Sequence, residues 1–142
     1  MLVWSGAFGS RLAQLAFISR IPAFAVKTWL LGTGAPPELV RAVQQSVAKV
    51  RGRVLIDRLE QVASCDVLSE LSKIEVPILY LRATKDRLIP GRCLEEILEV
   101  KPDMEVVSVP GPHLLLQREP KRTAEVVTNF LLQLDHLGRS ES

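Results

Sequence analysis

The feature that most restricts the fold of this chain is a change in hydrophobic periodicity near Val76. From there on, the sequence predicts a strand, a helix, a second strand and a closing helix, with the strands at Ile78–Leu81 and Glu105–Val109. The first strand is continuous and apolar, as expected of a parallel strand that is covered on both faces. Parallel neighbours are joined by a right-handed crossover, so this half of the chain predicts an α/β fold.

The preceding part of the chain has a helical pattern. Apolar residues recur at helical spacing from about Arg11 to Leu71, and Pro36-Pro37 suits the first turn of one of these helices. Met1–Trp4 is a short third strand candidate, so we expect about three parallel strands with flanking helices. The expected organisation is a residual strand and turn at 1–10, a helical segment at 11–72, an α/β section at 73–136 and a flexible tail at 137–142.

Composition and charge narrow the classes of function. A net charge of +2 and an aromatic content of 5% argue against nucleic acid as a partner. The most apolar section, residues 12–31, is interrupted by Arg20, Pro22 and Lys27, so it does not predict a membrane span. With no secretory signal at the beginning, we expect a soluble, cytoplasmic protein.

The cysteines and histidines do not predict a metal or cofactor site. Cys65 and Cys93 form no C-x-x-C pair, so reduced thiols are the first interpretation and a disulfide is the alternative. Together with His113 and His136, they show no metal-ligand spacing. We expect Cys65 to be a small buried residue and His136 to be a solvated residue near the end of the last helix.

Two polar side chains stand where the two predicted strands end. Asp86 lies in the sequence TKDRLIP after the first strand, and His113 lies in VPGPHLLLQ after the second. Adjacent parallel strands place their carboxyl ends at the same edge of a sheet, where open α/β sheets bind ligands. A carboxylate that accepts from an imidazole N–H makes the histidine a competent general base. The alternatives are a turn-forming aspartate and a loop histidine packed beside Pro112.

These motifs resemble the end of an α/β-hydrolase domain. The resemblance rests on an apolar strand preceded by VP, the acid in TKDRLIP, a helix, a short strand, GPHLLL and a final amphipathic helix, with the acid before the histidine as in that family. It implies that Asp86 and His113 are the acid and the histidine of a Ser-Asp-His triad. It also implies that the helical segment is a cap, and that Met1–Trp4 is the sixth strand of the sheet.

The nucleophile of that family is missing. No G-x-S-x-G pentapeptide occurs, and Ser5 and Ser10 flank GAFG with the wrong glycine spacing. The early loop that supplies an oxyanion-hole N–H is missing as well. We therefore expect a hydrolase that cleaves ester or acyl bonds, of which this chain holds the acid and the histidine. The alternative is a non-catalytic α/β interaction module, or a truncated gene product that has lost catalysis.

The same resemblance suggests the partners. The substrate would be a small-molecule ester or acyl compound, although this fold also handles lactones, amides, epoxides and haloalkanes. Phe17, Phe24 and Trp29 are candidates for lining an apolar pocket under the cap, with core packing as the alternative. An incomplete sheet suggests self-association or a complementing N-terminal polypeptide, and no cofactor is expected.

Overall fold

The computed structural model describes residues 21–140, with side chains for residues 21–136. Helical elements come first: α2 (Ala23–Ala25), the π-helix η1 (Val26–Leu31), α3 (Pro37–Ala48), α4 (Gly52–Ser64) and α5 (Leu68–Leu71). They are followed by β1 (Leu79–Ala83), α6 (Gly91–Val100), β2 (Glu105–Val109), α7 (Leu115–Arg118) and α8 (Pro120–Ser140). The described part is therefore mostly helical, and the predicted order from the first strand onward is present.

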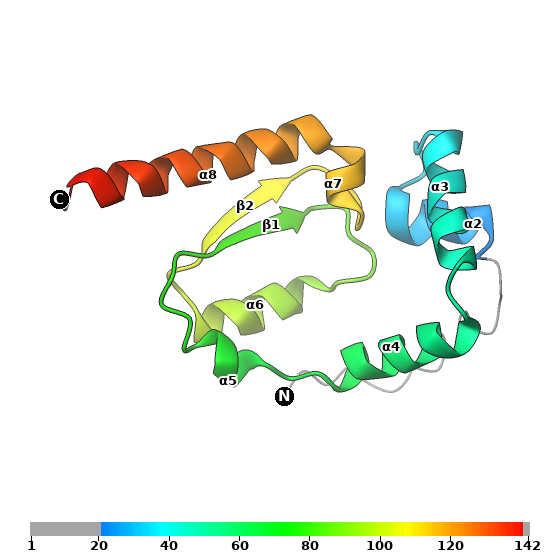
Figure 1. Cartoon of the computed structure of the whole chain (residues 1–142), viewed down its shortest axis with the longest axis horizontal. Helices are drawn as coiled ribbons and strands as arrows, with labels where there is room; N and C mark the ends of the chain where they lie inside the picture. Colours follow the sequence, from blue (N-terminus) through cyan, green and yellow to red (C-terminus); the bar gives the residue numbers. More distant parts are fainter. Residues whose placement is uncertain (1–20, 141–142) are drawn as a thin grey trace.

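The sheet of the described part has two parallel strands. The register pairs Leu79 with Glu105 at one end and Ala83 with Val109 at the other. In Figure 1 this small sheet lies between the long helix α8 and the shorter helix α6. The third strand, expected at Met1–Trp4, lies outside the described residues, so the prediction of about three strands is met for two of them.

β1 is less buried than its sequence predicts. β2 has the predicted bounds, whereas β1 begins at Leu79 and extends to Ala83, beyond the predicted end at Leu81. Every residue of β1 is at least partly exposed, and Arg82 is the most exposed residue of the strand, open to solvent. The expectation of cover on both faces is wrong for this strand. The physical reason is that helices cover the faces of a sheet, and among the described helices only α8 has more than marginal contact with β1.

The helices α2, η1 and α3 pack together at one end of the structure (Figure 1). Pro37 occupies the first turn of α3, where its missing N–H costs no hydrogen bond, and Glu38 follows it at the positive end of the helix dipole. Buried apolar side chains form the centre of this cluster: Val26, Leu31, Ala35 and Val40. From Ile21 onward the predicted helices of this segment are thus present, with η1 wound as a π-helix, and residues 11–20 of the segment lie outside the described part.

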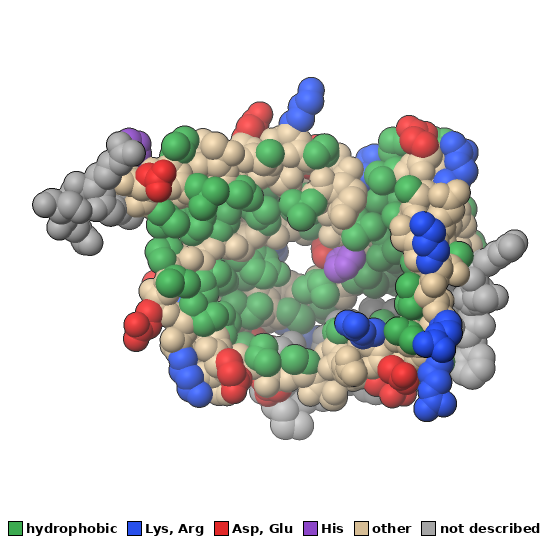
Figure 2. All heavy atoms as spheres, in the orientation of Figure 1, with side chains coloured by type: hydrophobic (Ala, Val, Ile, Leu, Met, Phe, Trp, Pro, Cys, Tyr) green, Lys and Arg blue, Asp and Glu red, His purple; other side chains and the backbone are tan. Residues whose placement is uncertain are grey.

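The closing helix is longer than expected and carries exposed apolar side chains. α8 continues to Ser140, past the predicted boundary at residue 136. Leu131 and Leu132 on this helix are 54% and 51% exposed. Figure 2 shows hydrophobic side chains gathered on the face formed by the sheet and its neighbouring helices. Among the described helices, none has the length and apolarity needed to cross a bilayer.

The cysteines are free thiols in contrasting positions. Cys93 in α6 is 8% exposed, whereas Cys65, just after α4, lies in the exposed class. The expectation of a buried Cys65 is therefore wrong. The residues around it are nearly all exposed because α4 ends there and the chain runs on over the surface.

Candidate active site

Hydrogen bonds between the two strands continue beyond their ends and fix the loops that follow. The Thr84 N–H donates to the Val109 carbonyl at 3.1 Å, and the Lys85 N–H donates to the Gly111 carbonyl at 2.9 Å. Asp86 follows Lys85 directly in one loop, and His113 lies two residues beyond Gly111 in the other. Parallel pairing therefore brings the acid and the histidine to the same edge of the sheet, as the sequence predicts.

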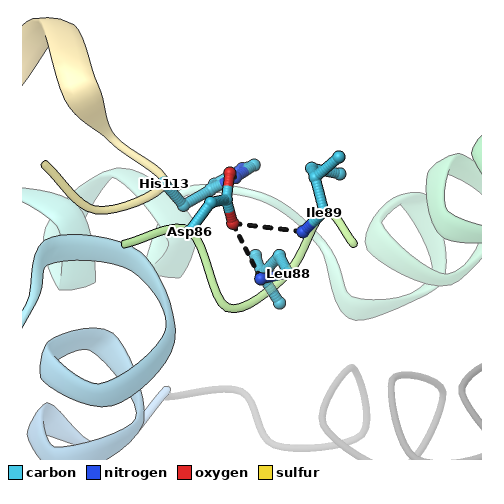
Figure 3. A network of polar contacts seen from close by, with 4 residues as sticks. All are labelled: Asp86, Leu88, Ile89 and His113. Atoms are coloured by element: carbon cyan, nitrogen blue, oxygen red, sulfur yellow. Dashed lines mark hydrogen bonds and ion pairs between the residues drawn. The ribbon is translucent and has the colours of Figure 1, made fainter. Parts of the chain in front are cut away.

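Asp86 is held through both of its carboxylate oxygens (Figure 3). Oδ1 accepts hydrogen bonds from the N–H groups of Leu88 at 2.7 Å and Ile89 at 3.1 Å. Oδ2 lies 2.9 Å from Nδ1 of His113. The predicted contact between the acid and the histidine is confirmed, and the catalytic role of the two residues stays a prediction. The turn reading of Asp86 is also correct, since the same side chain caps its own loop.

This arrangement orients the imidazole. With Nδ1–H donating to Asp86, the other ring nitrogen, Nε2, carries the lone pair that can accept a proton. The side chain of Asp86 is 14% exposed and that of His113 is 31% exposed. The carboxylate is therefore sheltered while part of the imidazole remains accessible. Such a pair can act as a general base toward a hydroxyl group placed beside Nε2.

A cleft of about 390 Å³ adjoins the pair. Apolar side chains from β1, the Asp86 loop, α6 and α7 form part of its wall: Leu81, Ile89, Leu94 and Leu115. Tyr80 and Arg82 add polar groups to the same wall, and Asp86 and His113 complete it. Its volume is in the range of small-molecule sites, which typically combine an apolar lining with a few polar groups.

Tyr80 gives a test of the charge in this cleft, because it is the only tyrosine in the chain. Burial, and then the negative charge of Asp86, raise the pKa of Tyr80 above its ordinary value of 10.0. The ultraviolet titration of tyrosinate should therefore have its midpoint above pH 10.0, and Asp86→Asn should lower it part of the way. The protonated form is favoured by folding, so this stability is complete below pH 10.0 and is lost as the pH rises through the folded-state pKa.

The matched control for that titration is Asp103→Asn. Asp103 is an exposed carboxylate whose Oδ2 pairs with Nζ of Lys101 at 2.8 Å. Its replacement removes the same charge and should leave the Tyr80 midpoint unchanged. Equal midpoints for Asp86→Asn and the wild-type chain would contradict a negative charge at residue 86 close to the tyrosine.

The other predicted site residues lie elsewhere or outside the described part. Phe24 and Trp29 are 70% and 40% exposed, and neither is among the residues that line the cleft. Phe17 lies outside the described residues. His136 is exposed on α8, as expected. Within residues 21–136, no group of three or more histidine, cysteine or acidic side chains is placed to hold a metal ion.

Two contributors to the site were missed by the sequence analysis. The amides of Leu88 and Ile89 carry no sequence signal of their own, although an aspartate before a short apolar stretch is compatible with a side-chain turn. Tyr80 was counted only as a strand residue. Consecutive residues of β1, including Leu81 and Arg82, line the same cleft, so the alternation of side chains along the strand carries no signal that singles out Tyr80.

Comparison with known proteins gives a structural likeness alone. No family model matches the sequence, and no curated protein matches it. Eleven chains of solved structures match, among them a hydrolase from Pseudomonas aeruginosa PA01 with a TM-score of 0.71 and 19% sequence identity. The match covers 91% of this chain and 52% of that protein, so the chain spans about half of the hydrolase's length. The structural neighbour is a hydrolase, and the likeness is consistent with an α/β-hydrolase-like fold.

Proposed function

We propose that this chain is the cap and C-terminal section of a serine hydrolase of the α/β-hydrolase type, which cleaves ester or acyl bonds. The observation that carries the proposal is the 2.9 Å contact between Nδ1 of His113 and Oδ2 of Asp86 at the carboxyl ends of two parallel strands. The likeness to a hydrolase of about twice this length supports it. The serine would come from polypeptide that precedes these elements in the complete fold.

In the complete enzyme, the roles of His113 and Asp86 follow from the geometry of their contact. Nε2 of His113 takes the proton from the serine hydroxyl as the serine oxygen forms a bond to the acyl carbon. The imidazolium then gives this proton to the leaving group as the acyl–oxygen bond breaks. Asp86 accepts the Nδ1–H throughout and stabilises the positive charge on the ring. The amides of Leu88 and Ile89 keep the carboxylate pointed at the histidine.

The adjoining cleft would receive part of the substrate. Its apolar wall suits an acyl chain or an apolar alcohol portion, because such groups gain free energy on leaving water. Arg82 and Tyr80 supply the polar groups that could fix the orientation of the substrate.

The coding sequence upstream of Met1 supplies the test. We expect an in-frame segment with a G-x-S-x-G elbow on a strand–turn–helix pattern, and esterase activity in the extended protein. In that protein, His113→Ala should lower kcat by about 10⁴-fold or more, because the general base is lost. His136→Ala is the matched control and should leave kcat unchanged.

Other results would count against the proposal. An extended protein with full activity after His113→Ala would show that the acid–histidine pair takes no part in the chemistry. If neither an upstream segment nor a separate polypeptide supplies a nucleophile, the non-catalytic α/β interaction module becomes the better interpretation.

A further inference from the structure

Residues 21–48, which we call the helical unit, form a compact body beside the histidine loop. The helical unit contains α2, η1 and α3 around its own buried cluster, which includes Val26 and Leu31, both 0% exposed. The side-chain amide of Gln44 in α3 donates to the carbonyl of Ile21 at 2.8 Å. This hydrogen bond connects α3 to the first residue of the helical unit. Shared packing and this hydrogen bond favour movement of the unit as one body.

The residue after His113 anchors the loop to this unit. The Leu114 N–H donates to the carbonyl of Leu30 at 2.8 Å. Carbonyls in the last turn of a helix lack partners inside the helix, so the histidine loop satisfies one of them at the end of η1. The Leu114 side chain also packs against the buried cluster of the helical unit.

The residue before His113 touches the same unit. Gly32 ends η1 with a φ of 77°, a backbone conformation that residues other than glycine rarely adopt. A Cβ added there would lie 3.6 Å from Cβ and Cγ of Pro112. The backbone turn at Gly32 is therefore in close approach to the histidine loop, and both chain neighbours of His113 contact the helical unit.

We infer that the helical unit positions His113 against Asp86, with Leu114 and Gly32 as the positioning residues. The Asp86 loop holds the imidazole from one side through Nδ1, and the helical unit holds its backbone through Pro112 and Leu114. A substrate or partner that displaces the helical unit would thus shift His113 relative to the acid. The chemical consequence of that shift rests on the proposed function, whereas the coupling itself is a property of the folded chain.

Two pairs of matched variants test the coupling in the full chain. Leu114→Ala removes the apolar anchor, and Leu116→Ala makes the same truncation at a side chain that is 57% exposed. Gly32→Ala strains the turn, whereas Gly34→Ala places its Cβ 3.8 Å from the guanidinium of Arg118 at a position without a positive φ. The second pair also covers the case in which Leu114→Ala fails to fold.

Hydrogen–deuterium exchange, followed by mass spectrometry at low protein concentration, measures both the backbone contact at Leu114 and the imidazole of His113. Backbone exchange in the peptide containing position 114 reports the hydrogen bond to Leu30. The exchange rate of the carbon-bound ring proton of His113 reports the environment of its imidazole. The same rate at His136 serves as the internal reference. For Leu114→Ala and Gly32→Ala we expect backbone exchange at position 114 to rise roughly tenfold and ring exchange of His113 to change roughly threefold or more. Both control variants should resemble the wild-type chain.

One pattern would overturn the inference. Faster backbone exchange at position 114 with unchanged ring exchange of His113 would show that the contact only stabilises the helical unit. In the wild-type chain, low denaturant provides the same comparison without a substitution, since the two signals should change together before global unfolding.

The outcome is separable from that of the proposed function. If the extended protein has no hydrolase activity, coupled exchange still establishes the positioning. If it is active, Leu114→Ala should lower kcat with little change in KM, and an unchanged kcat would reject a positioning role while leaving the hydrolase proposal intact.

Discussion

The chain alone is expected to hydrolyse p-nitrophenyl acetate at no more than a trace rate. Asp86 and His113 form an oriented base, but the sequence contains no G-x-S-x-G elbow for that base to activate. In serine hydrolases, a positioned nucleophile and an oxyanion hole together supply most of the rate enhancement. Removing the nucleophile alone lowers kcat by about 10⁶-fold. A small residual rate from the imidazole itself, acting as a weak general base, is the most that this geometry supports.

The decisive comparison is between the wild-type chain and two histidine variants. The trace rate should fall to the buffer rate with His113→Ala and persist with His136→Ala, because only the former histidine contacts a carboxylate in the described structure. Robust turnover that His113→Ala abolishes would contradict the prediction and would mean that a nucleophile is present. Ser5, Ser10 and Cys65 would then be the first residues to substitute.

The part of the site that follows from local sequence rules was predictable. β2 has the predicted bounds because its valine-rich sequence lies between Pro102-Asp103 and Pro110-Gly111, which favour turns. Parallel pairing then decides where the loops go, so the contact of Asp86 with His113 could be expected from the order of elements alone. Neither deduction depends on contacts that are distant in sequence, apart from the one pairing of strands.

The part that depends on distant packing was not predictable. The hydrogen bond from Leu114 to Leu30 joins two segments whose sequences carry no shared signal. The π form of η1 and the exposure of Phe24 depend on how the helical unit settles against its own core and the histidine loop. The partial exposure of β1 depends on which helices pack on its two faces, a property of the whole fold.

The chain alone is also expected to associate or to require a complementing polypeptide. In the described structure, β1 pairs with β2 on one edge only, and unpaired backbone N–H and C=O groups favour the addition of another strand. Large apolar side chains are exposed on the same body, including Val127, Leu131 and Leu132 on α8. The chain spans about half the length of the hydrolase that it resembles in fold.

Light scattering on the purified chain measures this association. At about 100 μM we expect dimers or larger species, because exposed edges and apolar faces promote association at micromolar to millimolar concentrations.

Leu131→Lys should weaken the association by roughly tenfold in dissociation constant, since a charge on an apolar contact face opposes desolvation. Gln133→Lys adds the same charge at an exposed polar position of the same helix and should have little effect. A well-dispersed monomer with cooperative unfolding at that concentration would contradict the incomplete-sheet prediction.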